Sequence, residues 1–402
     1  SHTFTKPLVF SAALARVTGG AHNLFHHPKF KSHPVNFPLY LHVPPDKRVN
    51  FADSGGSGLL GSRQLMNRIV MDTGSPEAAW LLKNLYGRPS DLLDIIWPTP
   101  AVEGKLPSQA SILFPTIGWA VLRSDFTDPD KVMIACKAGK NDDPHHGHLD
   151  VGQFMVYWRG QAFIRDFGSA EYDELFFGPK KYDTPHASSV GHNLIFVNGE
   201  RQVPGKLKDR PFDPSIGGDI LEFRPGAARD YVLMDPTKAY PGRELKGWRR
   251  HVVLDKPGIT VILDGVSSEK GAEIEARFHS ECAEAPRDGD TPIIGAKGAM
   301  ALIPVVQGGF TFRPGHHTYL AVFKRADVQR TPYNGTVVKA SGPSTLIAHL
   351  ILPVADDAEA KKIVKSVKRS IDGQGNLTIA FEKAGAKHVY AFGNDGKGLI
   401  LK

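Results

Sequence analysis

Cysteine is scarce in this sequence, and long hydrophobic runs are missing from it. Its 402 residues include two cysteines, Cys136 and Cys282. They allow one disulfide at most, which excludes both a disulfide framework and a multi-thiolate zinc site. No run reaches the ~18 consecutive apolar residues that a membrane-spanning helix needs, so no membrane span is expected. One pair of cysteines fits either redox environment, so the compartment stays open on this ground.

An excess of charge of one sign is also lacking. Lys and Arg number 49 against 42 Asp and Glu, a formal net charge of +7. With 41% hydrophobic and 23% charged residues, the composition excludes a disordered chain or a fibre. No helix-turn-helix, zinc-finger or aromatic-interleaved basic motif occurs, so nucleic acid is not an expected partner. A chain of this length is expected to form two or three domains.

Residues 1–105 have the pattern of a helical domain. Apolar residues recur at helical spacing over 7–17, and the pattern resumes over 59–72 and 76–86. Between the first two of these segments, residues 21–57 carry five prolines. Because proline removes a backbone donor and breaks helices, we expect that stretch to be irregular.

From about residue 110 the hydrophobic period changes from helical to alternating, which is typical of strands. Arg159-Gly160, between two alternating runs, predicts a tight hairpin. We therefore predict an α+β multidomain protein, with a large antiparallel multi-sheet β-sandwich domain over 106–310 and a C-terminal β-sheet region over 311–402. The predicted strands are 118–124, 132–136, 153–158, 161–166, 193–197, 250–254, 260–263, 318–323 and 377–381, and one late helix is expected at 355–367.

The densest group of polar residues surrounds His146 and His148. In extended backbone, these two histidines and Asp150 would project to one side. Asp166 and His192 follow at later strand ends, so three separate stretches offer an imidazole, a carboxylate and an imidazole. Two neutral histidines and one carboxylate suit zinc, with a fourth position left for water or another side chain.

The same residues allow other interpretations. Histidines in loops are often solvated or bonded to backbone groups and then bind no metal. His148, Asp150 and His192, with Arg201 nine residues further on, also have the form of an Fe(II)/2-oxoglutarate-type oxygenase site, in which the arginine binds the cosubstrate. That interpretation leaves His146 and Asp166 without a role.

Five motifs follow one another in the β-rich part of the chain. They are Phe114-Pro115-Thr116-Ile117-Gly118-Trp119, His146-Gly147-His148-Leu149-Asp150, Arg165-Asp166-Phe167-Gly168, His192-Asn193 and Arg277-Phe278-His279-Ser280. In order and spacing they resemble the β-domain of heparinase II/III-type polysaccharide lyases, over roughly residues 110 to 285. The resemblance implies that residues 1–105 are the C-terminal part of an (α/α) toroid. It also implies that a polysaccharide lies in the cleft between the toroid and the β-domain.

The resemblance also implies roles for individual residues. By position, His148, Asp166 and His192 match the ligands of a structural Zn2+, and His146 matches the histidine that faces the substrate. Lyases of uronic-acid polymers remove the C5 proton and expel the O4 group, so they need a base, an acid and donors for the carboxylate. His146 is the predicted base or carboxylate-neutralising donor. The alternative is that it orients a zinc ligand.

A tyrosine hydroxyl serves as the acid in such lyases. Tyr172 and Tyr182 are the predicted catalytic tyrosines, and Tyr157 is expected to pack. The family's principal catalytic tyrosine comes from toroid helices before the β-domain, and neither Tyr40 nor Tyr86 matches it. We therefore expect it on a segment, or on another chain, that precedes this sequence.

Basic residues near the predicted cleft suggest an acidic substrate. A basic groove concentrates an acidic polysaccharide, and arginine suits forked contacts with carboxylate or sulfate. Lys181, Arg201 and Gln202 are the predicted substrate-binding residues, and a solvated charged surface is the alternative. The basic residues of this group are Lys180, Lys181, Arg201, Lys206, Lys208 and Arg210.

These observations predict a polysaccharide lyase that cleaves a uronic-acid-containing glycan, such as a glycosaminoglycan or alginate, by β-elimination. The expected partners are an acidic polysaccharide, an N-terminal toroid segment and a second copy of the chain, and the expected location is periplasmic or secreted. The rival prediction from another class is a noncatalytic, zinc-containing glycan-binding module.

Overall fold

The chain forms two compact units. The computed structural model describes residues 2–89, 92–141, 146–170, 172, 176, 178, 180–205, 213–256, 258–280, 293–294, 300–320, 328–395 and 398–402. One unit comprises the residues up to Val49 with Gly56–Ile112 and Asp125–Pro129, and the other comprises Asn50–Gly55, Leu113–Ser124 and Asp130–Lys402. The second unit runs across the boundary predicted at residue 310.

The first unit is mainly helical. Ser62 caps α3 by accepting a hydrogen bond from the Leu65 amide, and Gly74 ends that helix in the left-handed conformation. Ser75 caps α4 in the same way, with Pro76 at the first helical position. The elements are α1 (His2–Val17), α2 (Pro28–Leu41), α3 (Arg63–Thr73), α4 (Pro76–Asn84), α5 (Leu92–Ile96), β1 (His42–Val43) and β2 (Lys47–Arg48).

The prediction of irregular structure over residues 21–57 is wrong for α2. Pro28 occupies the first helical position, where no backbone N–H is needed. Pro34 and Pro38 stand four residues apart, hence on one face of the helix, and both are buried. Packing of this face outweighs the loss of two backbone donors, which the proline count alone could not indicate.

The second unit consists of antiparallel sheets, as the alternating pattern predicts. Strand order is β3-β4-β5-β6-β7 in one sheet, β14-β15-β18-β12-β11-β10-β9 in the largest, and β16-β17-β13-β8 and β19-β20-β21-β22 in two more. The bounds are β3 (Ile112–Phe114), β4 (Trp119–Arg123), β5 (Met133–Lys137), β6 (Gln153–Trp158), β7 (Gln161–Ile164), β8 (Ile195–Val197), β9 (Asp219–Arg224), β10 (Arg229–Asp235), β11 (Gly247–Asp255), β12 (Ile259–Ser267), β13 (Glu273–His279), β14 (Ile293–Ile294), β15 (Met300–Val306), β16 (Thr311–Leu320), β17 (Val328–Lys339), β18 (Ser344–Pro353), β19 (Lys368–Ile371), β20 (Leu377–Lys383), β21 (Ala386–Asn394) and β22 (Leu399–Leu401).

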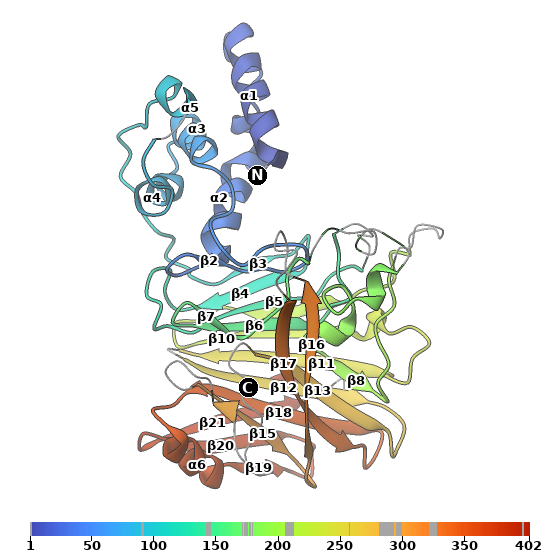
Figure 1. Ribbon diagram of the computed structural model, residues 1–402. Coiled ribbons are helices and arrows are strands. Elements are labelled where there is room, and N and C mark those ends of the chain that lie inside the picture. Colours follow the sequence, from blue (N-terminus) through green and yellow to red (C-terminus); the bar gives the residue numbers. More distant parts are fainter. Residues whose placement is uncertain are drawn as a thin grey trace. The chain divides into compact units, whose positions relative to one another are not determined.

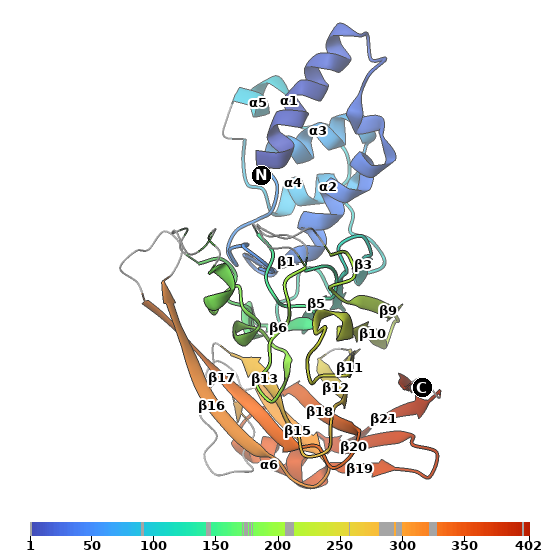
Figure 2. The ribbon, with the colours of Figure 1, turned by 90° about the vertical axis from the view of Figure 1, so that its right-hand side faces the viewer.

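The seven-stranded sheet is the central layer of this unit (Figure 1). Along β12, Ile262 and Val266 belong to a core shared with β4 to β7. Their neighbours Val261 and Leu263 belong to a second core shared with β20, β21 and α6 (Asp357–Ser366). Alternate residues of a strand face opposite sides, so both faces of the central sheet are covered. Figure 2 shows the C-terminal strands and α6 gathered on one side of that sheet.

Two local predictions are confirmed. Arg159 and Gly160 have φ values of 50° and 69°, the two positive values of a type I′ turn, and Trp158 pairs with Gln161 across it. The late helix is present as α6, with Asp356 accepting a hydrogen bond from the Glu359 amide at 2.8 Å. Among the described residues, no helix combines the length and apolar character that crossing a membrane requires.

A buried ion pair on the central sheet is hydrogen-bonded to the chain segments that follow His148 and His192. Arg250 on β11 donates to both carboxylate oxygens of Asp264 on β12, at 2.8 and 3.0 Å, and neither side chain is exposed. The remaining terminal nitrogen of Arg250 donates to the carbonyl oxygens of Gly152 at 2.8 Å and Asn193 at 2.5 Å. The same guanidinium thus fixes the chain just after His148 and just after His192.

Buried histidines make stability depend on pH. Burial, with a smaller contribution from the charge of Arg250, lowers the pKa of His349 from 6.5 to about 3. Between these values the unfolded chain binds more protons than the folded chain, so the free energy of unfolding rises with pH there, by up to ~1.4 kcal/mol per pH unit for each such group. We expect denaturant titrations to give a falling free energy of unfolding from about pH 7 to about pH 4, and His349→Gln to reduce that slope. His316→Gln, which removes an exposed imidazole, is the matched control. An unchanged slope in His349→Gln would contradict this account.

Candidate functional site

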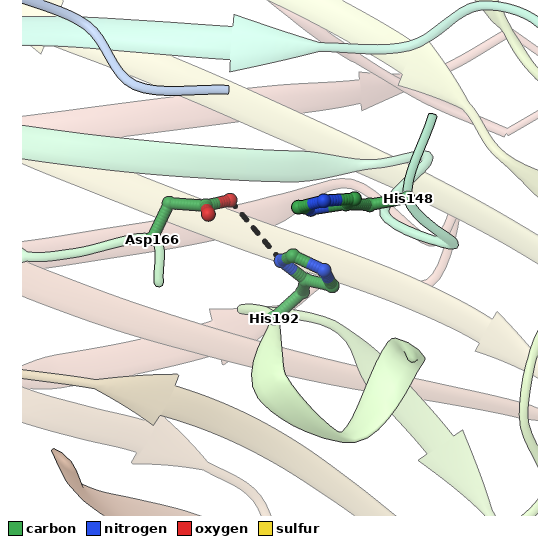
Figure 3. A group of neighbouring side chains, drawn as sticks. All are labelled: His148, Asp166 and His192. Atoms are coloured by element: carbon green, nitrogen blue, oxygen red, sulfur yellow. Dashed lines mark hydrogen bonds and ion pairs between the residues drawn. The ribbon is translucent and has the colours of Figure 1, made fainter. Parts of the chain in front are cut away.

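Three residues from separate parts of the chain meet in the second unit (Figure 3). His148 lies in the loop before β6, Asp166 lies two residues after β7, and His192 directly follows the short 3-10 helix Ser189–Gly191. Each offers one ligand atom, and these atoms all lie within 4.8 Å of one another. All three side chains are buried. These are the three residues that the sequence pattern groups together.

The polar atoms of this His–Asp–His group are unevenly satisfied. Asp166 accepts hydrogen bonds from the Gly168 amide at 2.6 Å and from the Gln153 side-chain amide at 2.7 Å, and its Oδ2 lies 3.1 Å from Nδ1 of His192. In contrast, Nδ1 of His148 and Nε2 of His192 have no hydrogen-bond partner. Buried polar atoms without partners are rare and costly, and imidazole nitrogens are common metal ligands. The donor set therefore fits a metal ion.

Burial and neighbouring charges shift the pKa values of the three residues in different directions. Burial lowers the pKa of His148, against the effect of Asp53, which raises it. Burial is the largest single effect on Asp166 and would raise its pKa, but the charge and hydrogen bond of His192, the charge of His148 and the hydrogen bond from Gly168 together lower that pKa to about 2. Burial opposes the charged form of His192 as well, yet the Asp166 carboxylate leaves the pKa of His192 raised. Metal ligation needs an ionised carboxylate and neutral imidazoles, so an ion bound here would displace the proton that Asp166 favours on His192.

Asn193 positions the ends of the strands that carry the group. Its side-chain amide donates to the carbonyl oxygens of Phe154 and Arg165, both at 2.9 Å, and its Oδ1 accepts from the His279 amide at 2.7 Å. Its own backbone amide donates to Oε1 of Gln153. Because Gln153 also donates to Asp166, the residues on either side of the group share one hydrogen-bond network.

Asp53 is a site residue that the sequence pattern does not reveal. Its Oδ1 lies 2.8 Å from Nε2 of His148, and its Oδ2 lies 2.7 Å from Nδ1 of His146. The Asp53 side chain is 5% exposed, whereas that of His146 is 58% exposed. Asp53 precedes His146 by 93 positions, in Ala52-Asp53-Ser54-Gly55. No motif or spacing in the sequence links the two.

His186 is a second residue that sequence reasoning missed. Its ring stacks on Phe176 with centroids 5.1 Å apart and lies 5.8 Å from the ring of His148. Burial, reinforced by His148, lowers the pKa of His186 to about 3, so the imidazole is neutral, and its Nε2 has no hydrogen-bond partner. In the sequence, its position six residues before His192 is the feature that could have indicated a place in the site.

The tyrosines occupy different environments. Tyr172 is 45% exposed, and its ring lies 4.3 Å from that of Phe176. Burial, followed by the negative charge of Asp53, raises the pKa of Tyr172, so its hydroxyl keeps its proton at neutral pH. Tyr182 is half-buried, with the Lys181 ammonium 5.9 Å from its ring centroid. Tyr157 packs, as expected: it is buried, and its hydroxyl donates to Asn50 and to the sulfur of Met155.

Two of the three predicted substrate-binding residues need correction. Gln202 is 3% exposed, and its side chain bonds to Asn141, Tyr240 and both backbone groups of Val151, which leaves little capacity for a sugar. Lys181 is 2% exposed, with its ammonium 5.4 Å from the ring centroid of Phe176, so it does not belong to an exposed basic surface. Residue type and position alone cannot distinguish such buried polar residues from surface ones.

The remaining predicted residues differ in their exposure and partners. Arg201 is exposed, and its guanidinium lies 3.5 Å from the Ser188 hydroxyl. Residues 146–152 form turns and a bend and no strand, and Asp150 does not belong to the group of ligand atoms. Its Oδ1 instead accepts from the buried Lys137 ammonium at 2.6 Å, which ties the carboxylate of the oxygenase interpretation to a cation outside the group. Cys282, Lys206, Lys208 and Arg210 lie outside the described residues.

The fold and the group together define a multi-sheet antiparallel β-domain with a buried His–Asp–His donor set. A family model described as heparinase II/III-like, C-terminal matches residues 106–364, and the chain belongs to this family. No curated protein matches the chain.

Solved structures of similar fold agree with this family. A heparinase III with methylated lysines has a TM-score of 0.68 at 16% identity, over 90% of this chain and 50% of its own. Another heparinase III structure gives 0.66 at 16% identity, over 91% and 54%. The heparan sulfate lyase HepC from Pedobacter heparinus gives 0.63 at 14% identity, over 90% and 51%. At these identities the likeness is one of fold, and the chain spans about half the length of these structures.

Proposed function

We propose that this protein is a polysaccharide lyase that cleaves a uronic-acid-containing glycan by β-elimination. The observation that carries the proposal is the exposed imidazole of His146, held by Asp53 next to the buried His–Asp–His group. A catalytic imidazole must reach the substrate while its orientation is fixed, and these contacts meet both needs. Membership of the heparinase II/III-like family supports the same class of reaction.

His146 and Tyr172 would carry the proton transfers. In β-elimination the C5 proton is removed and the O4 group departs, while donors meet the charge that builds on the uronate carboxylate. His146 is proposed to take the C5 proton or to donate to that carboxylate. Tyr172, whose pKa is raised by burial and then by Asp53, keeps its hydroxyl proton and suits donation to the leaving O4. Tyr182 is the alternative donor. The family's principal tyrosine is proposed to come from a toroid segment outside this chain.

His148, Asp166 and His192 would hold a structural Zn2+. The two imidazole nitrogens without partners and the carboxylate at low pKa support this assignment. The ion would supply cross-linking, because it would tie the loop before β6, the end of β7 and the residue before Asn193 to one point. The chain's own residues would then hold His146 against the glycan and move the protons.

An acidic polysaccharide is the proposed substrate, and Arg201 the proposed contact to its carboxylate or sulfate groups. Heparan sulfate is the first compound to test, because one of the similar structures is a heparan sulfate lyase. Other glycosaminoglycans and alginate come next. Helices α1 to α5 are proposed as the end of an (α/α) toroid. A polymeric substrate of this kind suits a periplasmic or secreted protein, and homo-oligomer formation remains a proposal.

Absorbance of the unsaturated uronate product tests the proposal. The complete, zinc-replete protein would be incubated with heparan sulfate, hyaluronan, chondroitin sulfate and alginate, and the new ultraviolet absorbance followed. We expect a rise with at least one polymer. Flat traces with all four, together with retained binding of a polymer, would replace the lyase by the noncatalytic glycan-binding module. A cosubstrate-dependent oxidation, with 2-oxoglutarate consumed, would instead support the oxygenase interpretation.

A further inference from the structure

We infer that Asp53 is a positioning residue whose carboxylate joins His148 of the buried group and the exposed His146 into one hydrogen-bonded array. The inference rests on the proposed function for the role of His146. Its geometric basis does not, because one carboxylate stands 2.7 and 2.8 Å from the two imidazoles.

The contacts to Asp53 determine which nitrogen of each imidazole donates a hydrogen bond and which one stays available. A carboxylate accepts hydrogen bonds, so Nε2 of His148 and Nδ1 of His146 donate to Asp53. For His148 this leaves Nδ1, which has no hydrogen-bond partner, as the nitrogen available to a metal ion. Asp53 itself stands outside the group of described residues whose ligand atoms lie within 4.8 Å of one another. It is therefore placed to orient a ligand, in the carboxylate–histidine–metal arrangement that fixes ring orientation.

The burial of Asp53 makes these hydrogen bonds strong. Its side chain is 5% exposed, and the His148 side chain is fully buried. Hydrogen bonds to an ionised acceptor gain strength where water is excluded. The His146 side chain is 58% exposed, and its bond to the buried Asp53 carboxylate is one contact that holds its ring in a fixed direction.

The loop that carries Asp53 is built into the second unit. The side chain of Asn50 donates to the Asp166 carbonyl oxygen and accepts from the Tyr157 hydroxyl, both at 3.3 Å. A side chain at Gly168 would meet the Ser54 carbonyl oxygen at 2.5 Å, so this glycine allows the loop to lie close. Ala52 has a φ of 56°, a left-handed conformation that is unfavourable for alanine. Strain of this kind is retained where neighbouring contacts fix the backbone.

Variants of Asp53 in the complete, zinc-replete protein test the array. Asp53→Asn keeps the shape but leaves one acceptor oxygen for two N–H donors. We expect kcat on the cleaved uronate polymer to fall about 10–100-fold, KM to change less than about 3-fold, and zinc affinity in competition with a chromophoric chelator to fall about 10-fold. Asp53→Glu, which keeps both oxygens, should recover part of each loss. Asp219→Asn, which alters an exposed carboxylate paired with Lys238, is the matched control and should change none of them.

A double variant separates positioning from a general structural effect. If Asp53 acts through His146, then Asp53→Asn/His146→Ala should have a kcat no lower than that of His146→Ala alone. Two results would overturn the inference. One is that the losses in kcat of the two single variants add up in the double variant. The other is that kcat and zinc affinity of Asp53→Asn both stay within 2-fold of the unchanged protein. If the complete protein cleaves no uronate polymer, the proposed function fails by itself. The array is then judged on zinc affinity: a loss in Asp53→Asn supports it, and an unchanged value overturns it.

Discussion

Replacement of His146 by Ala should lower kcat on the cleaved uronate polymer at least about 100-fold, with the fold retained. General acid–base catalysis by a positioned side chain contributes roughly 10²- to 10⁴-fold, and His146 is the exposed imidazole of the site. Its side chain is 58% exposed, so the fold should survive its removal, with a loss in the free energy of unfolding of no more than about 1.5–3 kcal/mol, which is what a hydrogen bond to a charged group contributes. Initial rates of product absorbance and a thermal melt of the same sample measure both quantities.

His316→Ala is the matched control for this variant, because it also removes an exposed imidazole from the second unit. It should retain the rate and the melting temperature of the unchanged protein. A His146→Ala protein with a normal rate would remove His146 from the reaction. A variant that loses both rate and melting temperature would instead assign His146 to maintenance of the buried group.

Local patterns were sufficient for most of the second unit. The alternating runs predicted β4 to β7 within two residues at each end, because strands buried on at least one face must alternate or be continuously apolar. The Arg159-Gly160 turn was predictable for a similar reason, since both positions have positive φ and glycine favours it. In these cases the residues that set the structure are close together in the sequence.

The failures share one physical cause, which is long-range packing. The two interior prolines of α2 disfavour a helix locally, but both are buried in the first unit. Gln202 has the chemistry of a sugar-binding residue, yet its amide completes a buried network with Val151 and Asn141. Burial depends on which segments pack together, and no local signal reports it.

The candidate site was predictable in part. His148, Asp166 and His192 could be grouped because each follows or precedes a recognisable strand and because the motifs resemble one family. Asp53 could not be, since the loop that carries it is separated from His146 by 93 positions and contributes through a contact made only in the folded chain. Asp150 is the opposite case. It is close to His148 in the sequence and was therefore predicted to project beside it, but in the folded chain it pairs with Lys137.

Replacement of Asp166 by Ala should release the metal and lower the melting temperature by several degrees. The substitution removes a proposed ligand and leaves the Gln153 amide and the His192 imidazole without their acceptor. Each buried donor left unpaired costs about 1–3 kcal/mol, and an ion present at about 100 times its Kd stabilises the folded state by about 2.7 kcal/mol. Elemental analysis after gel filtration gives the metal content. Thermal melts with and without a chelator separate two effects. Chelation should lower the melting temperature of the unchanged protein, because it removes the ion. Any further lowering in Asp166→Ala then comes from the lost hydrogen bonds.

Asp150→Asn is the informative comparison, because it alters another buried carboxylate of the same segment. Breaking its pair with Lys137 should also lower the melting temperature, since a buried charge loses its partner. The metal should nevertheless remain, because Asp150 stands outside the His–Asp–His group. Two results would assign the ligand role to Asp150 in place of Asp166: Asp166→Ala retains the metal, or Asp150→Asn is the one variant of the two that loses it. The iron-type interpretation of the site would then replace the zinc proposal.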